Sequence, residues 1–430
     1  MSGPTASTTP HDLPDLEPET RDLVSRAERR FDELLRGERV FPDRIGLVLA
    51  AGAATRFRPL TASREHAMRG LLDDERRFSV VPWNKASLPI GCRSLIDFTL
   101  ADMVTSGFRH IMVNVSRLNA PDTIIRSAGD GSRFGPDVAV TYSVEDEPTG
   151  TYGGVVRMLD RFARVRPIPR ATDVAIFSGD IYTEQPGYEI LRAHRERDAA
   201  FTMMLNPVPD EMKSQFGTVE LDEDNGIIAF HEKRPDSPSN LNNSSRYIAK
   251  SDLLMRWAGK VTPVPPDKKV HARPECFFDF GLHVFSRHLL GLKEAGFLGF
   301  PSDRMWADIG RIADFHEVNL GFLRSRVMNR VHPAARVAEG SELSGHYHVG
   351  ASAVLSPGSA VSDSVVGAGW VIDGARIERS VLMPLPAGTT FRVAAGTRLD
   401  GCVVGCGDIT ASATGKVIVF NGDDLVFADL

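Results

Sequence analysis

Short apolar runs alternate with amphipathic segments along most of this chain. The apolar runs lie at residues 45–50, 110–115 and 173–177, and such runs are typical of strands buried on both faces of a parallel sheet. Helical spacing of apolar residues is found between them, at residues 95–106 and 152–162. The alternation predicts an α/β domain with a Rossmann-like, doubly wound and mainly parallel sheet.

The pattern changes after Asn329. Gly, Ser and Ala now surround an apolar residue that returns about every six positions, which is the spacing of a hexapeptide β-helix. Because the repeat is irregular, a small β-sandwich is the alternative interpretation. The sequence predicts a C-terminal left-handed parallel β-helix with apolar positions at Val337, Leu343, Val349, Val354, Val361, Val366, Val371, Ile377, Leu382, Val393, Leu399 and Val404.

An amphipathic segment precedes the first predicted strand. Residues 17–39 show helical spacing of apolar side chains among many charges, which predicts one docking helix without chemistry of its own. Its apolar positions are Leu23, Ala27, Phe31, Leu34 and Leu35. We therefore expect an N-terminal extension at 1–44, an α/β domain at 45–328 and a β-helix domain at 329–430.

The composition narrows the function classes. The chain has 430 residues and a formal net charge of -6, so its bulk charge attracts neither nucleic acid nor an anionic membrane surface. Its start resembles neither a signal peptide nor a membrane span, and we expect a cytoplasmic protein. The four cysteines form neither a disulfide framework nor a zinc-ligand pattern, and we expect Cys402 and Cys406 to pack in the core.

The first predicted strand runs into a loop of small side chains that ends in an arginine, Ala51-Gly-Ala-Ala-Thr-Arg56. Small residues let the backbone N–H groups of Ala50, Ala51 and Gly52 approach a triphosphate closely. Arg56 can then neutralise a leaving pyrophosphate. The structural alternative is a tight turn with a surface arginine. The loop by itself is therefore only a moderate indication of a local phosphate site.

The order of motifs over residues 45–430 resembles that of the sugar-1-phosphate nucleotidyltransferases, most closely the ADP-glucose pyrophosphorylase branch. The family's first loop reads Leu-Ala-Gly-Gly-x-Gly-x-Arg-Leu, and Leu49-Ala-Ala-Gly-Ala-Ala-Thr-Arg-Phe57 stands in its place here. Two family glycines have become Ala51 and Ala54. Since a methyl group is costly where φ is positive, we expect a slightly reshaped loop.

Two further motifs extend the implied nucleotide site. Trp83-Asn-Lys-Ala-Ser-Leu-Pro resembles the family segment whose lysine contacts the phosphates, which implies that role for Lys85. Pro148-Thr-Gly-Thr-Tyr resembles the family's Gly-Thr-Ala segment, which implies that Gly150 and Thr151 contact base and ribose. Residues 62–84 form a charged insertion, longer than the usual family loop, that can act as a lid over the nucleotide.

Two aspartates complete an implied metal site. Phe177-Ser-Gly-Asp180 resembles the family's Ala-Gly-Asp, and Trp306-Ala-Asp-Ile-Gly310 resembles its Trp-x-Asp-x-Gly. The resemblance implies that Asp180 and Asp308 together hold Mg2+, a hard cation that prefers oxygen ligands. A helix cap is the structural alternative for Asp180.

The acceptor site is implied by a phenylalanine-glycine segment and a Glu-Lys-Pro-like motif. These nominate Gly217, Glu232 and Lys233, with the lysine holding the sugar phosphate and the glutamate accepting hydrogen bonds from sugar hydroxyls. The implied reaction joins a nucleoside triphosphate to a sugar-like 1-phosphate and releases pyrophosphate. It requires no covalent intermediate, since a phosphate monoester is already an anionic nucleophile.

Three positions depart from the branch and concern substrate choice. Asn243 and Ser245 stand where ADP-glucose pyrophosphorylases have a Ser-Met-Gly-Ile-Tyr segment against glucose, and Ser116 aligns with the adenine-contacting glutamine. The pattern resembles branch members of aminocyclitol biosynthesis, which join GTP to a cyclitol phosphate such as valienol 1-phosphate. It favours that pair over ATP and glucose 1-phosphate, which are the first alternative.

Two other classes of protein are open alternatives. Hexapeptide β-helices also occur in acyltransferases, where His346 and His348 would act as bases, although a structural role suits them better. A catalytically silent regulatory subunit is the second, but such subunits usually lack a lysine or aspartate, and all the charged positions named above are present. We expect a homo-oligomer, a dimer or tetramer, without a nucleic acid or membrane partner.

Overall fold

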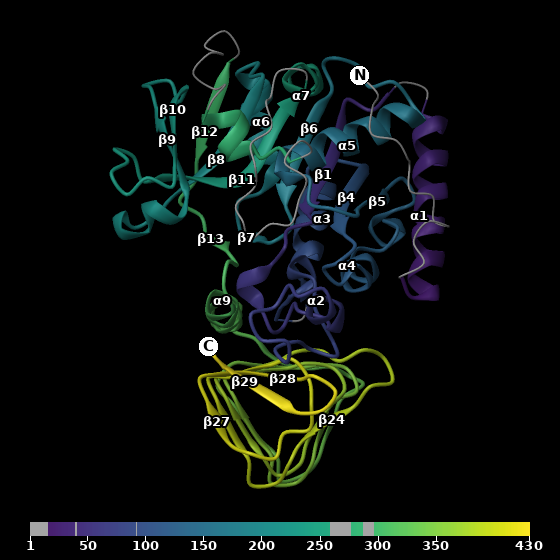
Figure 1. Ribbon diagram of the computed structural model, residues 1–430, viewed down its shortest axis with the longest axis vertical. Coiled ribbons are helices and arrows are strands. Elements are labelled where there is room, and N and C mark those ends of the chain that lie inside the picture. Colours follow the sequence, from purple (N-terminus) through teal and green to yellow (C-terminus); the bar gives the residue numbers. More distant parts are fainter. Residues whose placement is uncertain (1–15, 39–40, 92, 259–276, 287–295) are drawn as a thin grey trace. The chain divides into compact units, whose positions relative to one another are not determined.

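The computed structural model describes residues 16–38, 41–91, 93–258, 277–286 and 296–430 (Figure 1). The chain forms two compact units. We call them the sheet unit, which comprises Met1–Ala53, Ile96–Arg117 and Pro121–Asp308, and the β-helix unit, which comprises Ala54–Leu95, Leu118–Ala120 and Ile309–Leu430. The division at residues 45–328 and 329–430 stays a prediction, because it follows the sequence pattern whereas the two units interleave along the chain.

A mixed sheet forms the centre of the sheet unit. Within the described residues its order is β10-β9-β11-β6-β1-β4-β5, and β8 joins β12 to β11. The strands β6, β1, β4 and β5 run parallel, whereas β11 is antiparallel to β6. The predicted doubly wound, mainly parallel sheet is confirmed, with strands at Arg44–Ala50 (β1), His110–Ser116 (β4), Ala139–Glu145 (β5), Asp173–Ser178 (β6), Phe201–Pro207 (β8), Gly217–Leu221 (β9), Ile227–Glu232 (β10), Leu241–Lys250 (β11) and Phe297–Pro301 (β12).

Helices pack on this sheet through side chains that are fully buried. Tyr152, Val155, Met158 and Phe162 recur on one face of a helix and lie in the same apolar cluster as Leu47 of β1. This spacing puts the apolar face of the helix against the sheet. The helices and helical turns of the unit are α3 (Leu95–Thr105), α4 (Pro121–Ala128), η4 (Ser132–Phe134), α5 (Gly150–Val165), α6 (Gly187–Glu196), η5 (Asp210–Gln215), α7 (Ser251–Ala258) and η7 (Phe280–Phe285).

The predicted amphipathic helix forms as α1, Pro18–Gly37. Ala27, Phe31 and Leu35 are buried on it as expected, while Val24 rather than Leu23 is the buried apolar residue of the first turns. Arg30 fixes the helix beside β5, because its guanidinium donates hydrogen bonds to the backbone carbonyls of residues 135, 136 and 138. The helix docks through its apolar face and one arginine.

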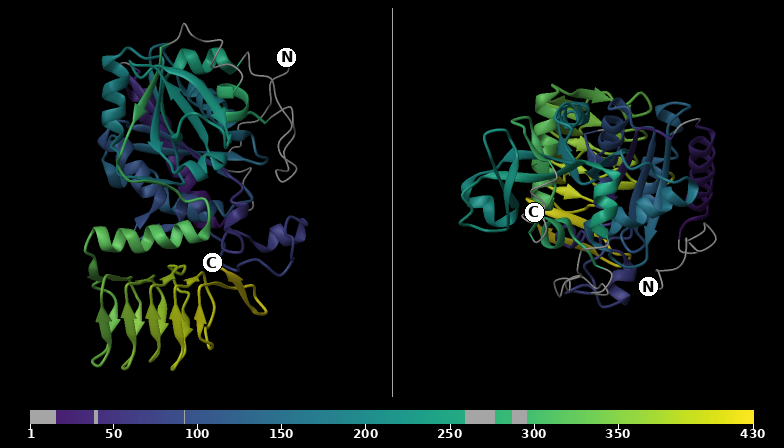
Figure 2. Two further views of the ribbon diagram at one scale, coloured as in Figure 1. Left: turned by 90° about the vertical axis from the view of Figure 1, so that its left-hand side faces the viewer. Right: turned by 90° about the horizontal axis from the view of Figure 1, so that it is seen from above.

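The C-terminal strands build a parallel β-helix, which confirms that prediction. They stack coil on coil in three sheets, as the green-to-yellow strands in Figure 2 show. One sheet contains β14 (Asn329–Val331), β17 (Tyr347–Val349), β20 (Val365–Val366), β23 (Val381–Leu382), β26 (Val403–Val404), β28 (Lys416–Phe420) and β29 (Leu425–Asp429); the second contains β15 (Arg336–Val337), β18 (Val354–Leu355), β21 (Trp370–Ile372) and β24 (Phe391–Val393); the third contains β16 (Glu342–Ser344), β19 (Ala360–Ser362), β22 (Arg376–Glu378), β25 (Arg398–Asp400) and β27 (Ala413–Thr414).

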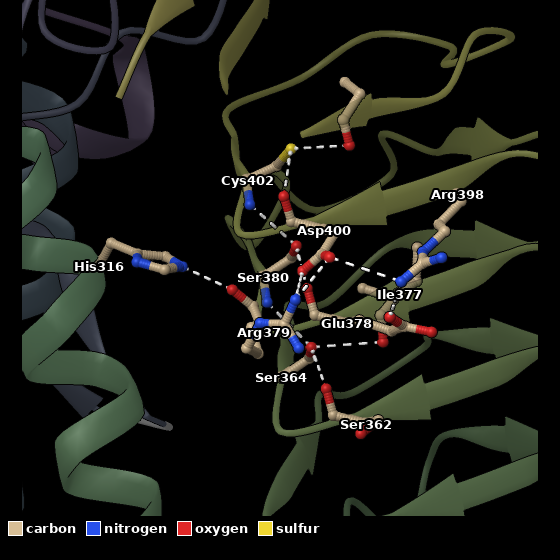
Figure 3. Close-up of polar contacts among 11 residues, drawn as sticks. His316, Ser362, Ser364, Ile377, Glu378, Arg379, Ser380, Arg398, Asp400 and Cys402 are labelled. Carbon is tan, nitrogen blue, oxygen red and sulfur yellow. Dashed lines mark hydrogen bonds and ion pairs between the residues drawn. The ribbon is translucent and has the colours of Figure 1, made fainter. Parts of the chain in front are cut away.

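Serine hydroxyl groups at one corner connect three successive coils of the β-helix (Figure 3). The Ser364 Oγ accepts the N–H of Ser380, and the Ser380 Oγ accepts the N–H of Cys402, both at 3.0 Å. The residue before each of these three, such as Arg379 at φ 44°, turns the corner in the left-handed region. A small polar side chain is needed here because a buried N–H without an acceptor is costly.

Several positions of the predicted β-helix interior differ in the structure. Val354 and Val371 are half-exposed, whereas Leu355 and Ile372, the residues after them, are fully buried, and Val337 is exposed. The prediction was wrong for Val354 and Val371 because alternate residues of a strand face opposite sides, and the six-residue spacing slips by one at both. Cys402 and Cys406 are buried, free cysteines, as expected.

Part of the charged insertion at 62–84 packs on the last coil of the β-helix, within the same unit. The Val80 N–H donates to the Phe420 carbonyl at 2.9 Å, and the Asn421 amide donates to the Arg76 carbonyl at 3.0 Å. Ser79 Oγ lies 3.3 Å from Cys406 Sγ. The insertion therefore covers the end of the β-helix; its function as a lid stays a hypothesis.

The remaining elements of the β-helix unit are short, apart from one helix. They are η2 (Thr55–Phe57), α2 (Arg64–Met68), η3 (Lys85–Ser87), β2 (Pro89–Ile90), β3 (Arg93–Ser94) and α9 (Ile312–Ser325). Asn319 of α9 accepts the Gly91 N–H at 2.8 Å and donates to the Pro89 carbonyl at 3.0 Å. Across the part of the chain that the structure describes, no helix has both the length and the apolar character of a membrane span.

Candidate active site

The carboxyl ends of three parallel strands bring several predicted residues to one edge of the sheet. Leu49 of β1 pairs with Asn114 of β4 on one side and with Ser178 of β6 on the other. Ala50 and Ser116 therefore lie at this edge. Ligands of open α/β sheets bind outside the carboxyl ends of the strands, so this edge is the candidate nucleotide site.

The two predicted metal ligands meet on a short antiparallel ribbon at the same edge. It pairs β7 (Ile181–Thr183) with β13 (Trp306–Asp308), and Asp308 lies opposite Ile181, the residue after Asp180. The Gly179 N–H donates to the Leu49 carbonyl at 2.8 Å, which fixes this turn beside the end of β1. Ser178 Oγ donates to Asp180 Oδ1 at 2.8 Å. The sequence separates Asp180 from Asp308, and the ribbon brings their backbones together.

This donor set fits Mg2+. Both carboxylates are half-buried and supply oxygen ligands, and Mg2+ in phosphate-transfer sites is held by one or two carboxylates together with substrate phosphates. Within the described ranges, no cluster of three or more His, Cys, Asp or Glu side chains forms a richer metal site. The Asp180–Asp308 pair is the metal candidate.

The predicted base-and-ribose segment is bonded to residues that the sequence analysis missed. Gly150 has φ 76°, and a Cβ there would overlap the carbonyl of Phe278. That carbonyl accepts the N–H groups of Tyr152 and Gly153, both at 3.0 Å. The Thr151 hydroxyl donates to Asp279 Oδ2 at 2.9 Å. Residues 277–280 thus cap the start of α5 and leave no room for a side chain at Gly150.

The only sequence signal for that missed segment is its composition. Phe277-Phe-Asp-Phe-Gly281 places one aspartate among aromatic residues, and such a carboxylate needs a polar partner when it packs inside a protein. The partner is Thr151, which is 128 positions earlier in the chain. Nothing in a single sequence connects the two.

The predicted acceptor residues come together on the β9–β10 hairpin. Gly217 pairs directly with Glu232, and a Cβ at Gly217 would lie 3.0 Å from Glu232 Oε2. A Cβ at Gly281 would lie 2.7 Å from the same oxygen, so two glycines make room for this carboxylate. Lys233 Nζ lies 3.6 Å from Glu232 Oε1 and its side chain is 61% exposed.

An acidic and a basic side chain lie next to each other at the end of this hairpin, Glu232 and Lys233. Burial raises the pKa of Glu232, the Lys233 ammonium opposes that shift, and Asp279 adds to it. The Lys233 ammonium is exposed and can bind a phosphate, while Glu232 lies where it can accept hydrogen bonds from hydroxyl groups.

Asn243 and Ser245 lie in an irregular part of β11. The register between β11 and β8 shifts between Asn243 and Tyr247, Ser245 has φ 56°, and Asn243 Oδ1 accepts the Ser245 N–H at 3.1 Å. The family glycine that Ser245 replaces is explained by this backbone, since glycine adopts positive φ without strain. The two residues form one local turn, so their substitutions act together.

Arg56 and Lys85 belong to the β-helix unit. Arg56 is exposed, and a Cβ at Gly310 would lie 3.4 Å from its Nη1. Lys85 Nζ lies 5.7 Å from the centre of the Phe57 ring. Ala54, where the family has glycine, has φ 49°, so an alanine adopts the left-handed backbone conformation there; the reshaped loop stays a prediction. The predicted metal and acceptor residues belong to the sheet unit.

Comparison with known proteins defines the class. The model of the nucleotidyl transferase family matches residues 45–325, and the chain belongs to this family. The relatives of the chain are named as enzymes that transfer a nucleotidyl group to a sugar 1-phosphate. The prediction that the chain is an enzyme of the sugar-1-phosphate nucleotidyltransferase type is confirmed.

Three curated relatives cover most of the chain. It is 26% identical to a mannose-1-phosphate guanylyltransferase of Mycobacterium tuberculosis over 77% of this chain and 80% of the relative. It is 26% identical to a UTP--glucose-1-phosphate uridylyltransferase of Synechocystis over 85% and 89%. It is 27% identical to a glucose-1-phosphate adenylyltransferase of Geobacillus stearothermophilus over 79% of each. The three names differ in their nucleotide, so similarity alone does not choose the base.

Proposed function

We propose that this protein transfers a nucleotidyl group from a nucleoside triphosphate to a sugar-like 1-phosphate and releases pyrophosphate. The observation that carries the proposal is the ribbon that places Asp180 beside Asp308 at the carboxyl edge of the sheet. A Mg2+ ion held by these carboxylates would neutralise charge that develops on the phosphates.

The roles of the other side chains are those that the family resemblance implies, and their charges agree with them. Lys233 binds and orients the acceptor phosphate, which attacks the α-phosphorus in line, and Glu232 accepts hydrogen bonds from the acceptor's hydroxyls. Arg56 and Lys85 stabilise the departing pyrophosphate. Because the acceptor is already an anion, positioning and electrostatic stabilisation suffice and no general base is needed.

For the substrates we propose GTP and a cyclitol phosphate of the valienol 1-phosphate type. Ser116 replaces the glutamine that contacts adenine in the branch, and the turn at Asn243 and Ser245 replaces the segment against glucose. One relative is named a guanylyltransferase, although others are adenylyl- and uridylyltransferases. ATP with glucose 1-phosphate is the alternative pair. The proposal also comprises a cytoplasmic homo-oligomer, a dimer or tetramer.

The acyltransferase alternative has less support. His348 is buried, and burial lowers its pKa to about 4, so its imidazole is a weak base. The backbone N–H of His346 is bonded to Asp363, whose carboxylate caps this corner at 2.9 Å. A silent regulatory subunit is disfavoured because Arg56, Lys85, Asp180, Lys233 and Asp308 are all present.

The test combines binding and turnover. A thermal-shift screen of the four common triphosphates ranks the nucleotides, and pyrophosphate release with a panel of 1-phosphates then identifies the acceptor. We expect kcat/KM for GTP with a valienol-type 1-phosphate to exceed that for ATP with glucose 1-phosphate at least about tenfold, or roughly 1.4 kcal/mol. A preference for ATP and glucose 1-phosphate would refute the substrate proposal and leave the class intact.

A further inference from the structure

A buried asparagine–glutamate pair at the carboxyl edge has no role in the reaction described above. Asn114 lies in β4 and Glu145 is the last residue of β5; they are 3% and 2% exposed. Asn114 Oδ1 accepts the Ala50 N–H at 2.6 Å, and its Nδ2 donates to Glu145 Oε1 at 2.8 Å. Glu145 Oε2 accepts the Thr149 N–H at 3.3 Å. Three hydrogen bonds thus form one continuous chain.

Both ends of this chain are starts of predicted nucleotide-binding segments. Ala50 is the last residue of β1 and directly precedes the loop of small residues, and Thr149 immediately precedes Gly150 and Thr151. The two segments are about a hundred positions apart in the sequence, yet one pair of side chains holds a backbone N–H of each. A shift of the pair would move both segments relative to the nucleotide, and displacements of about 1 Å can cost about a hundredfold in rate.

The neighbouring helix is built around the pair. A Cβ at Gly154 of α5 would lie 2.5 Å from Asn114 Nδ2 and 3.0 Å from Glu145 Oε1, so a side chain there would displace both groups. Burial raises the pKa of Glu145, and its hydrogen bonds with Asn114 and Thr149 oppose that shift. A carboxylate is costly to bury unless it is fully hydrogen-bonded, and this one has a bond on each oxygen.

We propose that Asn114 and Glu145 are positioning residues for nucleotide binding, which hold the first phosphate loop and the start of α5 in their binding geometry. The inference rests on the proposed function and deepens it. The direction of each hydrogen bond makes it testable, because Glu145 must accept twice whereas Asn114 accepts once and donates once.

Single substitutions break the chain, and one double substitution restores it. In Glu145→Gln the amide oxygen can accept a hydrogen bond from only one of the two partner groups, Asn114 Nδ2 or the Thr149 N–H. The amide NH2 group then faces the second of these donors, and no hydrogen bond forms between two donors. In Asn114→Asp two buried carboxylates become neighbours, which is unfavourable. The double variant Asn114→Asp with Glu145→Gln keeps the net charge and rebuilds every bond. The new carboxylate at position 114 accepts from the Ala50 N–H and from the new amide at position 145, and the oxygen of that amide accepts from Thr149.

The experiment compares the wild-type chain, both single variants and the double variant. We expect each single variant to raise KM for the triphosphate at least about tenfold, with KM for the acceptor changed less than about threefold, and the double variant to return to within about threefold of wild type. Calorimetric titration with each triphosphate gives the same comparison as a dissociation constant and needs no acceptor.

A core substitution provides the control for lost stability. Phe31→Leu removes buried ring contacts with Phe162, so it should lower the unfolding midpoint and leave KM unchanged. Unchanged nucleotide affinity in the single variants, or no recovery in the double variant, would overturn the inference. Failure of the proposed function has a different signature, which is a wild-type chain that neither binds nor turns over any triphosphate.

Discussion

The sheet unit and the β-helix unit use their buried polar groups differently. In the β-helix unit, the Ser364 and Ser380 hydroxyls accept hydrogen bonds from backbone N–H groups of the next coil. The repeated coils therefore provide the hydrogen-bond partners of these buried side chains. In the sheet unit, the buried Asn114 and Glu145 lie where parallel strands end. A stacked coil always meets a similar neighbour, whereas the end of a parallel sheet meets loops and ligands.

This difference separates stability from chemistry. Changes in the serine ladder should alter unfolding and leave the kinetic constants alone, and changes at the half-buried metal carboxylates should do the reverse. Four predictions test that separation, from the largest expected effect to the smallest.

The metal carboxylates should show the largest effect. Asp180→Asn and Asp308→Asn should each lower kcat at least about a hundredfold, because each removes a metal ligand charge and no core packing. Asp303→Asn is the control, since Asp303 is an exposed carboxylate shortly before β13. Pyrophosphate release at saturating substrates measures all three. Near-normal turnover in either metal variant would contradict the assignment.

The two cation sites should separate donor from acceptor. Lys233→Ala should raise KM for the 1-phosphate about tenfold or more and affect the triphosphate far less, whereas Arg56→Ala should act mainly on the triphosphate. Lys213→Ala is the control for Lys233→Ala, since it also removes one lysine charge. Lys213 differs in that its ammonium group is already bonded to the Ser237 carbonyl and to Asp210. The opposite selectivity would reverse the placement of donor and acceptor.

The serine ladder should affect stability only. Ser380→Ala leaves the buried Cys402 N–H without its acceptor, at a cost of about 1 to 3 kcal/mol. Urea unfolding should show that loss while kcat/KM stays constant. Ser380→Cys should cost less, because Cys402 occupies the equivalent position of the next coil and its Sγ contacts backbone carbonyls there. Equal losses for both variants would show that the side-chain acceptor is unimportant.

The strained loop residue should give the smallest effect. Ala54 has φ 49°, and Ala54→Gly should raise the free energy of unfolding by about 0.5 to 1 kcal/mol, because glycine adopts this backbone without a Cβ clash. Ala53→Gly is the control: Ala53 is not among the positive-φ residues, so glycine there should not stabilise. Differential scanning calorimetry of the two variants decides between them.

Sequence periodicity predicted the elements better than it predicted their contacts. The apolar runs at β1, β4 and β6 and the six-residue repeat identified the sheet and the β-helix, because burial on a regular element leaves a periodic signal. Val371 shows the limit, since a slip of one residue inverts the face of a strand. Motif resemblance nominated Asp180 and Asp308, and β7–β13 pairing shows them as neighbours.

The polar contacts that organise the site could not be predicted in the same way. Asn114 reaches Ala50 across 64 positions and Glu145 across 31, and Thr151 reaches Asp279 across 128. Asp279 stands out only as one aspartate among aromatic residues, and Asn114 and Glu145 do not stand out by local composition or spacing. Such contacts depend on strand order and register, which single-sequence patterns do not specify.

The most direct measurement of the central claim is pyrophosphate release by the wild-type chain with each triphosphate and a 1-phosphate acceptor, with Mg2+ and again after chelation. The account predicts one pyrophosphate for each nucleotidyl-sugar or nucleotidyl-cyclitol formed, and loss of at least about 99% of the rate on chelation, since the Asp180–Asp308 pair acts through the metal. No release with any of the four triphosphates, or release that chelation leaves unchanged, would contradict it.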